Sequence, residues 1–466
     1  MSKNKLGFWV LTALVIGNMV GSGIFMLPHN LALEASPAGV LSAWVITGIG
    51  VLLTALVFGN LSLRKPELNG GPQMYARAMF RAGTGRSRLS GYIVAWGYWL
   101  ANATGNVAII TTFASYLSTF FPVMTSQAEL FQIGSYAVKT GNFITFLVCT
   151  AMLWLIHTLV LRGVEGAGKV NFLATAAKVL GFLFFIIAAL FAFQKANILP
   201  LVQPRVVEGT QEAVSLFGQI NGAAISTLWA FVGVESAVVF SSRARKQSDV
   251  KKATITGLVV ALIIYMGITV LTMGALTQDQ LMATEKPLVD ALMSVVGTPG
   301  SSLMAILGLI SLAGSMIGWI MLSSEVPFQA AKQGMFPRFF LKENKKGAPR
   351  NSLIVSNLLS QVFIFSTISE SVAGAFGFVI TVATLSYLVP YVIASLYQLK
   401  LTVTGESYQG QSRSRTTDFL IAFFATVYSA WVIYAGTSDM KTFLLGVGML
   451  LVGLIFYPFV KKSTSL

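Results

Sequence analysis

The chain has little charge, one cysteine and two histidines, and each scarcity excludes a class of protein. Only 11% of its 466 residues are Asp, Glu, Lys or Arg, whereas a soluble domain has roughly 25%. The single Cys149 excludes a disulfide framework and a cysteine-based metal site. His29 and His157 are too few to suggest a catalytic zinc centre. We therefore expect neither a metal nor a cofactor.

Apolar residues make up 55% of the chain, and the mean hydropathy is +0.73. A lipid bilayer is the solvent that suits this composition, because a globular interior cannot bury so much apolar surface. Windows of about 20 apolar residues mark segments long enough to span it as helices. The sequence predicts an all-α integral membrane protein with twelve transmembrane helices, at residues 8–32, 38–62, 90–121, 143–161, 170–193, 215–240, 254–276, 301–331, 352–369, 371–399, 418–437 and 440–460.

The basic residues are distributed unevenly between the connections of these segments. If the connections alternate between two sides, 26 of the 32 Lys and Arg residues fall on the side that holds both termini, and five on the other. Cytoplasmic connections are enriched in Lys and Arg. We therefore expect a multi-pass protein of the inner, cytoplasmic membrane with both termini in the cytoplasm. The net charge of +15 is then a sign of topology, and we expect membrane lipid, not nucleic acid, as a partner.

Two of the twelve segments contain glycine and polar residues near mid-membrane. The first holds GNMVGSGIF at 17–25, and the sixth holds WAFVGVES at 229–236. Glycines in membrane helices often serve close packing, and Gly17 with Gly21 fits that pattern. However, each segment is the first of a set of five, where inverted-repeat transporters place their discontinuous helices. We therefore expect an inverted repeat of residues 1–200 and 201–400, followed by two helices in 401–466.

A helix that breaks inside a membrane leaves backbone groups that a zwitterion can satisfy. The N–H groups at the start of a half-helix attract a carboxylate, and the freed carbonyls at the end of another half-helix accept from an ammonium group. The expected groups are the N–H groups of Ser22, Gly23 and Ile24 and the carbonyls of Met19, Trp229 and Val232.

Four motifs follow one another along most of the chain: GNMVGSGIFMLP at 17–28, GGPQMYAR at 70–77, WAFVGVESA at 229–237, and Gly318-Trp319 followed by GMFP at 334–337. They resemble the amino acid–polyamine–organocation superfamily and, within it, the basic amino acid/polyamine antiporters. The resemblance implies a 5+5 inverted-repeat fold of leucine-transporter type with discontinuous first and sixth helices. It also implies transport of cationic amino acids by alternating access.

The resemblance further implies roles for individual residues. Ser22 and Gly23 match a carboxylate-binding turn, and Trp229 matches an aromatic lid over the bound side chain. Asn102 stands where the arginine/agmatine exchanger has a cysteine, which argues against agmatine as substrate. The positions that match the site for the cationic end are Ala101, Asn102 and Asn106, and those that match gates are Tyr75, Tyr98, Trp229, Trp319 and Tyr391.

Two ionisable residues lie at membrane depth, where an unneutralised charge is costly and commonly functional. Glu235 follows the glycine of the sixth segment and could attract a cation or carry a proton. Lys178 resembles a lysine that family members place where sodium-coupled relatives bind a cation. Snorkelling to the interface is a simpler interpretation of Lys178, but its mid-segment position argues against it. We expect both residues to couple transport to a proton or cation.

These patterns favour a transporter over other membrane proteins. A membrane enzyme would need paired acids, a Ser–His pair or metal ligands, and a channel would need repeated lining motifs. Residues 163–170 resemble a P-loop, but Val170 stands where magnesium binding requires Ser or Thr. We predict arginine/ornithine exchange. A lysine or polyamine exchanger, a proton-coupled amino-acid symporter, an amino-acid sensor on the same fold and a homodimer all remain open.

Overall fold

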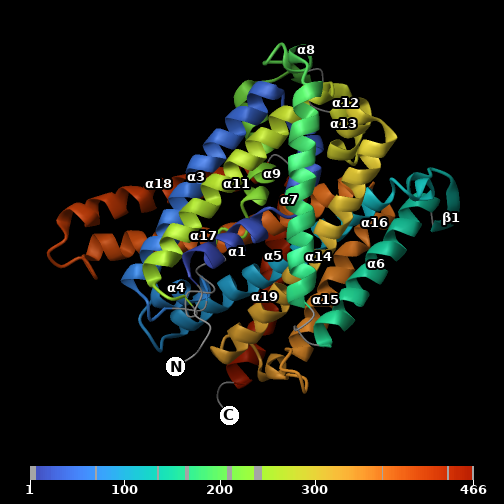
Figure 1. Ribbon diagram of the computed structural model, residues 1–466. Helices are drawn as coiled ribbons and strands as arrows, with labels where there is room; N and C mark the ends of the chain where they lie inside the picture. The colour runs from blue at the N-terminus through green and yellow to red at the C-terminus, as the bar shows by residue number, and fades with distance from the viewer. Residues whose placement is uncertain are drawn as a thin grey trace.

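The computed structural model describes residues 7–68, 71–133, 136–162, 167–206, 213–235, 244–369, 371–437 and 440–463. This part of the chain is a bundle of helices (Figure 1). The helices are α1 (Phe8–Met19), α2 (Gly23–Glu34), α3 (Pro37–Arg64), α4 (Gln73–Ala78), α5 (Gly85–Leu117), α6 (Thr140–Leu161), α7 (Ala167–Ala192), α8 (Lys195–Ile198), α9 (Leu216–Ala230), α11 (Gln247–Ala275), α12 (Gln278–Ala283), α13 (Pro287–Val296), α14 (Thr298–Lys332), α15 (Arg350–Ile364), α16 (Ser366–Ser369), α17 (Val372–Thr404), α18 (Ser412–Gly436) and α19 (Met440–Ser463).

Two short antiparallel hairpins depart from the all-α expectation. They lie in connections between helices, and each is too short for an alternating pattern to distinguish it from a loop. The strands are β1 (Glu129–Ile133) with β2 (Tyr136–Lys139), and β3 (Arg205–Val206) with β4 (Ala213–Val214); the short 3-10 helices are η1 (Pro122–Thr125) and η3 (Arg338–Leu341).

Eight spans in the described chain are long and apolar enough to cross a membrane: α3, α6, α11, α14, α15 with α16, α17, α18 and α19. The pair α1 and α2 meets the same test together, with a bend of 42° between its two halves. The other three expected segments overlap α5, α7 and α9. These helices do not pass the test of length and apolar composition. The count of twelve therefore remains a prediction.

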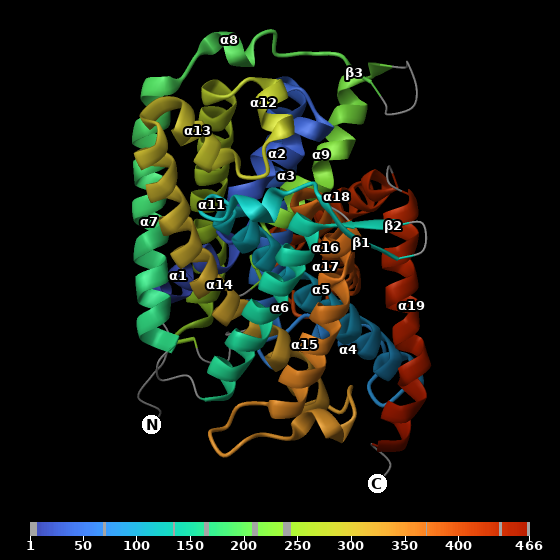
Figure 2. The same cartoon turned by 90° about the vertical axis from the view of Figure 1, so that its right-hand side faces the viewer.

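The helix α5 lies at the centre of the bundle (Figure 2), where it packs against α14, α15 and α17. From Gly91 onward its polar residues are buried, and several of its threonines donate to the carbonyl four residues earlier. Thr111 donates to Val107 O at 3.0 Å and Thr112 to Ala108 O at 2.7 Å. A central helix does not face lipid, so its polar residues need protein partners instead of an apolar surface. This explains why α5 is long but not strongly apolar.

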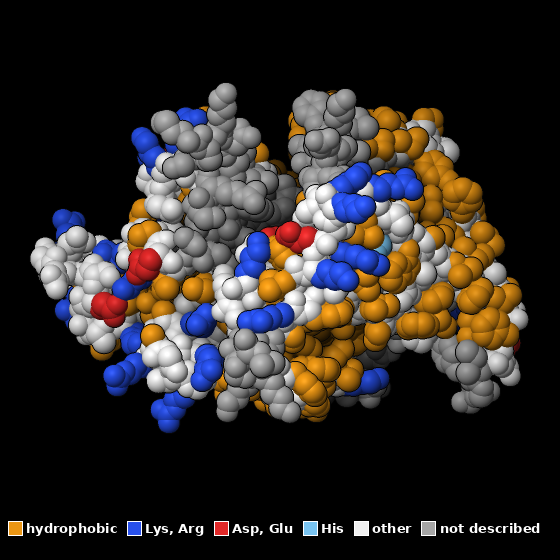
Figure 3. Space-filling model, turned by 90° about the horizontal axis from the view of Figure 1, so that it is seen from below, with side chains coloured by type: hydrophobic (Ala, Val, Ile, Leu, Met, Phe, Trp, Pro, Cys, Tyr) orange, Lys and Arg blue, Asp and Glu red, His pale blue; other side chains and the backbone are white. Residues whose placement is uncertain are grey.

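Large apolar side chains are exposed on the peripheral helices, for example Phe191 of α7 at 86%, Tyr434 of α18 at 63% and Ile455 of α19 at 66%. Such surfaces suit lipid contact. Lys and Arg side chains gather on the lower face of the bundle (Figure 3), which we call the basic face. The connection between α14 and α15, with Lys345 and Lys346, lies at this end, and α12 and β3 lie at the opposite end (Figure 2).

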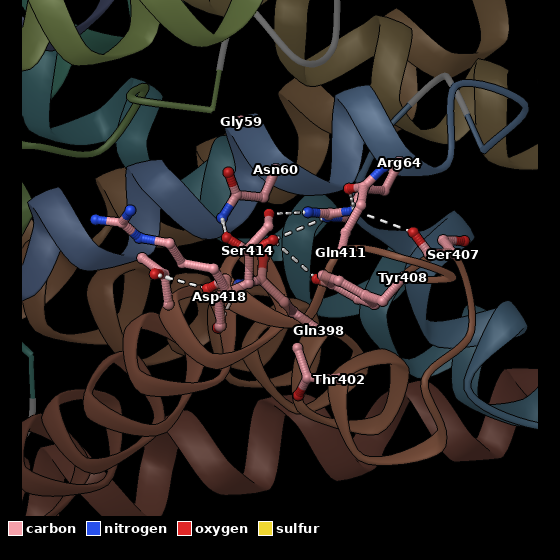
Figure 4. A network of polar contacts seen from close by, with 12 residues as sticks. Gly59, Asn60, Arg64, Gln398, Thr402, Ser407, Tyr408, Gln411, Ser414 and Asp418 are labelled. Carbon is pink, nitrogen blue, oxygen red and sulfur yellow. Dashed lines mark hydrogen bonds and ion pairs between the residues drawn. The ribbon is translucent and has the colours of Figure 1, made fainter.

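A buried polar network ties α3 to α18 (Figure 4). The Asp418 carboxylate accepts from Asn60 Nδ2 at 2.9 Å, Arg64 Nε at 2.8 Å and Tyr408 Oη at 2.9 Å. The Arg64 guanidinium also lies 3.7 Å from the centre of the Tyr408 ring. Lys251 of α11 donates to Asn60 Oδ1 at 2.7 Å. The network therefore joins three helices that are far apart in the sequence.

Candidate functional site

The first expected break is present between α1 and α2. The helix α1 ends at Met19, Val20 to Ser22 are not helical, and α2 begins at Gly23. The Gly21 N–H donates to Met19 O at 2.7 Å, which closes a tight turn where the helix stops. The first N–H groups of a helix have no acceptor within it. The turn therefore presents the N-terminus of α2 inside the bundle.

The second expected break follows α9. The helix ends at Ala230, and residues 231–235 form turns; the remainder of the expected span, 236–240, lies outside the described residues. Gly233 has φ +104°, and a Cβ there would be 3.1 Å from Asn18 Cβ and 3.2 Å from the Asn18 carbonyl carbon. This close approach to the end of α1 requires glycine. The two breaks are therefore in contact.

Tyr265 of α11 bridges the two breaks. Its hydroxyl lies 2.5 Å from Met19 O and 2.8 Å from Ala230 O, so it donates to one carbonyl or the other. Its ring stacks on Trp44 at a centroid distance of 5.3 Å and meets Phe231 edge to face at 5.6 Å. Tyr265 is a single tyrosine in an apolar run, and no pattern in the sequence indicates these long-range contacts.

A small cavity of about 10 Å³ lies where the breaks meet. It has room for about one water molecule. The residues that line it are Asn18, Met19, Gly21, Ser22, Gly23, Ile109, Trp229, Val232 and Trp319. Five of the six residues expected to bind through their backbone are thus gathered around one point. The sixth, Ile24, is buried in the first turn of α2 and does not line the cavity.

Two of the expected carbonyl acceptors already have protein donors in this conformation. Met19 O accepts from Gly21 N, and also from Tyr265 Oη when that hydroxyl does not donate to Ala230 O; in that arrangement both lone pairs of the oxygen are used. Trp229 O accepts from Val232 N at 3.1 Å and shares the Phe231 N–H with Leu228 O. An ammonium group that binds Met19 O or Trp229 O would therefore compete with these protein donors.

The two tryptophans close the cavity together. The ring centroids of Trp229 and Trp319 are 6.1 Å apart, and the ring planes are tilted by 41°. Gly105 of α5 lies against both: a Cβ there would be 3.1 Å from Trp229 Cη2 and 3.1 Å from Trp319 Cζ3. A larger residue at 105 would push the rings apart. Gly105 therefore belongs to the site, although one glycine in the middle of a helix gives no sign of this.

The two amides expected near the cationic end lie on α5 within three residues of Gly105, and neither lines the small cavity. Asn102 donates from Nδ2 to Tyr98 O at 2.6 Å, and Asn106 donates from Nδ2 to Ser323 Oγ at 3.0 Å. The Oδ1 atoms of both are buried without a hydrogen-bond partner in the described chain. Buried acceptors of this kind cost about 1–3 kcal/mol each when unpaired. Ala101, which is fully buried, does not line the cavity.

Glu235 holds two tyrosines together. Tyr98 Oη of α5 donates to Glu235 Oε1 at 3.1 Å, and Tyr391 Oη of α17 donates to Oε2 at 2.7 Å. The Gly233 N–H also donates to Oε2, at 3.2 Å. All three partners are donors, which suits an ionised carboxylate. A proton on either carboxylate oxygen would add a donor there and disturb a tyrosine bond.

Tyr75 lies one ring away from this cluster. Its ring stacks on Tyr397 at 6.1 Å and contacts Phe58 at 6.5 Å, and Phe58 in turn meets Tyr391 at 5.6 Å. The structure therefore places Tyr98 and Tyr391 on the Glu235 carboxylate, and connects Tyr75 to them through Phe58.

Lys178 lies near the first break. Its Nζ is 3.5 Å from Gly17 O of α1 and 3.5 Å from Ser315 Oγ of α14. Gly17 precedes the end of α1 by two residues. The ammonium group therefore links α7 to α1 and α14 just before the chain breaks, where a bound cation could do the same.

The comparison with known proteins agrees with these features. The chain matches the family described as "Amino acid permease" over residues 6–458. A "Putative arginine/ornithine antiporter" of Bacillus subtilis (strain 168) is 53% identical over 460 residues, which cover 98% of this chain and 97% of the relative.

Two further relatives are more distant but extend over the same length. An "Arginine/ornithine antiporter" of Pseudomonas aeruginosa is 36% identical, and the alignment covers 100% of this chain and 92% of the relative. The "Arginine/ornithine antiporter ArcD1" of Lactococcus lactis subsp. cremoris is 32% identical, and the alignment covers 99% of this chain and 85% of the relative. All three are transporters, in agreement with the expectation that this protein is not an enzyme. The chain belongs to the amino acid permease family, within the amino acid–polyamine–organocation superfamily.

Proposed function

We propose that this protein exchanges arginine outside for ornithine inside across the cytoplasmic membrane. The observation that carries the proposal is the contact of two chain breaks at a buried cavity that Ser22, Gly23 and Trp229 line. The names of the three relatives supply the identity of the substrates. In such a site, backbone donors and acceptors bind the α-carboxylate and α-ammonium groups that all amino acids share. Protein side chains contact the substrate side chain, which differs between amino acids.

Contacts at both ends of the arginine molecule orient it in the site. Its α-carboxylate binds the N–H groups of Ser22, Gly23 and Ile24 at the start of α2, where the helix dipole favours negative charge. Its α-ammonium group binds the carbonyl of Val232, and those of Met19 and Trp229 as their protein donors are displaced. The guanidinium group has five N–H donors, and the unpaired Oδ1 atoms of Asn102 and Asn106 are acceptors for two of them.

The side chains around the cavity must move before arginine can enter. A volume of about 10 Å³ holds about one water. Trp229 and Trp319 are the large side chains at this point, so their displacement opens the site and the return of Trp229 closes it over the substrate. The Tyr98–Glu235–Tyr391 cluster and Tyr75 close the path toward the basic face.

The proposed arrangement has twelve transmembrane helices, with α1 and α2 forming the first. Residues 1–200 and 201–400 each contribute five in inverted orientation, and 401–466 contribute α18 and α19. The basic face meets the cytoplasm, with both termini there, because cytoplasmic connections are enriched in Lys and Arg. Glu235 couples transport to a proton, and Lys178 takes the place of a bound cation.

Uptake of labelled arginine into proteoliposomes tests this function. We expect uptake only into vesicles loaded with ornithine, and competition by unlabelled lysine to be stronger than by leucine. Uptake into empty vesicles driven by a proton gradient would contradict exchange and indicate a symporter. Binding of arginine without flux under any loading would contradict transport and indicate a sensor.

A further inference from the structure

A second, much larger cavity lies at the end of the bundle that faces away from the basic face. Its volume is about 810 Å³, within the range of about 300–1,000 Å³ typical of ligand pockets. The helices α2, α9, α12, α16, α17 and α19 contribute to its wall, and α12 marks this end of the molecule in Figure 2. We call it the acidic cavity, after Glu34 and Glu285, which line it together with Asn30.

Two helices connect this cavity to the site between the breaks. Gly23 of α2 lines the small cavity and Asn30 of the same helix lines the large one; seven residues of helix span about 10 Å. On α9, Trp229 lines the small cavity and Ser226, one turn earlier, lines the large one. A molecule in the acidic cavity is therefore separated from the site by Trp229 and about two turns of α2.

The charge of the acidic cavity suits a cation. Among the described residues that line it, Glu34 and Glu285 carry negative charge and Lys441, which is exposed, carries positive charge. Glu285 is fixed in place because its Oε1 accepts from Ala373 N at 3.4 Å. His29 is tied to the wall, since its Nδ1 donates to Leu281 O at 3.0 Å. Two carboxylates against one ammonium group attract a ligand of net positive charge.

Asn30 gives an independent sign of a ligand with hydrogen-bond donors. It lines the cavity, it is only 9% exposed, and its Oδ1 has no hydrogen-bond partner in the described chain. A buried carbonyl oxygen without a donor is costly in a folded protein. An ammonium or guanidinium group in the cavity would supply that donor.

Two glycines lie beside the polar side chains of α2. A Cβ on Gly222 of α9 would be 2.6 Å from Glu34 Oε2, and a Cβ on Gly377 of α17 would be 3.4 Å from Asn30 Nδ2. The first distance is too short for the present position of the Glu34 carboxylate, whereas the second is an ordinary contact. A side chain at position 222 would therefore displace the Glu34 carboxylate.

We propose that the acidic cavity is a second binding site for the cationic amino acid, occupied before it reaches the breaks. This inference rests on the proposed function. The cationic end of the substrate faces Glu34, Glu285 and Asn30 Oδ1, and the α-carboxylate faces Lys441 at the rim. The site captures substrate on one side of the membrane only, the outside in the proposed orientation, and it discriminates against neutral amino acids by charge.

Initial rates of arginine uptake into right-side-out membrane vesicles loaded with ornithine test the proposal. For the double variant Glu34→Gln/Glu285→Gln we expect the apparent KM for external arginine to rise about tenfold, which corresponds to about 1.4 kcal/mol. The wild-type KM should increase with ionic strength, and the double variant should lose most of that dependence. The half-saturating concentration of internal ornithine should not change.

Two other variants separate binding from a structural effect. Lys441→Gln removes the opposing charge from the same cavity and should lower the external KM about twofold, a shift that damage to the fold would not produce. Glu129→Gln removes an exposed carboxylate of β1 that does not line the cavity, and it should leave the KM unchanged.

The outcomes distinguish this site from the transport function. If wild-type protein exchanges arginine, but the double variant and Lys441→Gln keep its external KM and salt dependence, the acidic cavity is not a binding site and the proposed function stands. If wild-type protein does not take up arginine at all, the proposed function and this inference both fail.

Discussion

At the scale of single residues, Trp229 has the most direct test. Its ring lines the small cavity and packs 6.1 Å from that of Trp319, so a shorter side chain leaves the substrate uncovered. We expect Trp229→Leu to reduce exchange at least about 100-fold while the amount of protein in the membrane stays normal. Trp9→Leu, at a position that is 75% exposed, is the control and should exchange normally. Wild-type turnover in Trp229→Leu would exclude it as the gate.

The contacts of Glu235 predict that the exchange rate depends on pH. Its carboxylate accepts from Tyr98 and Tyr391, and protonation would disturb these bonds. An amide at this position cannot ionise, so we expect exchange by Glu235→Gln to vary less than about twofold over a pH range in which the wild-type rate changes severalfold. The control is Glu406→Gln, since that side chain is 51% exposed. A pH profile that Glu235→Gln leaves unaltered would remove the proton role.

The contacts of Tyr265 with both breaks predict that exchange depends on its hydroxyl group. Its hydroxyl is within hydrogen-bond distance of Met19 O and Ala230 O, and Tyr265→Phe removes the single donor that one of these two carbonyls accepts from. A lost hydrogen bond of this kind costs about 1–2 kcal/mol, so we expect exchange to slow by about tenfold or more. Tyr434→Phe, 63% exposed on α18, should have no effect. Normal exchange by Tyr265→Phe would show that the bridge is dispensable.

The residues that the sequence could identify are those whose local pattern is unusual. Met19, Ser22 and Gly23 belong to a glycine-rich run inside an apolar segment, and they line the small cavity. Tyr265 and Gly105 have ordinary neighbours, and their importance arises from contacts with residues distant in the chain. A local pattern cannot reveal such contacts, because packing decides them.

At the scale of elements, the network around Asp418 (Figure 4) fixes α18 against α3. Asp418 is 6% exposed, and an amide has one acceptor oxygen, so it would set an NH2 group against either Asn60 Nδ2 or the Arg64 and Tyr408 donors. We expect Asp418→Asn to lower the free energy of unfolding in detergent by about 2–4 kcal/mol. Glu406→Gln, which breaks an exposed ion pair with Lys65, should cost less than about 1 kcal/mol. Equal stability of both variants would contradict a structural role for the network.

The same network has a defined dependence on pH. Burial and the hydrogen bond to Asp418 raise the pKa of Tyr408 above its usual value, so the folded state favours the protonated phenol. Its contribution to stability is therefore fully present below about pH 10, the ordinary tyrosine pKa, and is lost only as the pH rises through the higher value of the folded state. Thermal unfolding of wild-type protein and Tyr408→Phe should accordingly differ by a constant amount between about pH 6 and 9.

Element positions were predictable from hydropathy where helices face lipid, and less so elsewhere. The bounds of α6 and α19, whose side chains are mostly not buried in the bundle, agree with the expected spans within a few residues. The helices α12 and α13 lie outside those spans. Both helices have local start signals, since Thr277 and Gln280 form a capping box and Pro287 begins α13. A search for long apolar runs nevertheless misses them, because they have only six and ten residues.

At the scale of the whole molecule, the orientation can be tested with the single native cysteine. Cys149 is fully buried, so it gives little background reaction. In intact cells we expect Thr125→Cys, in the connection before β1, to react with a membrane-impermeant maleimide. Lys345→Cys, on the basic face, should react only after permeabilisation. The reverse pattern would place the basic face outside and contradict the proposed topology.

Binding of arginine between the two breaks is the central claim, and tryptophan fluorescence of the purified protein measures it most directly. Arginine must enlarge a cavity of about 10 Å³ that Trp229 and Trp319 line, so it changes the surroundings of both rings. We predict a saturable fluorescence change with arginine and with ornithine that Trp229→Leu reduces strongly and Trp9→Leu preserves. A change of the same size and affinity in Trp229→Leu and in Trp319→Leu would show that arginine binds elsewhere.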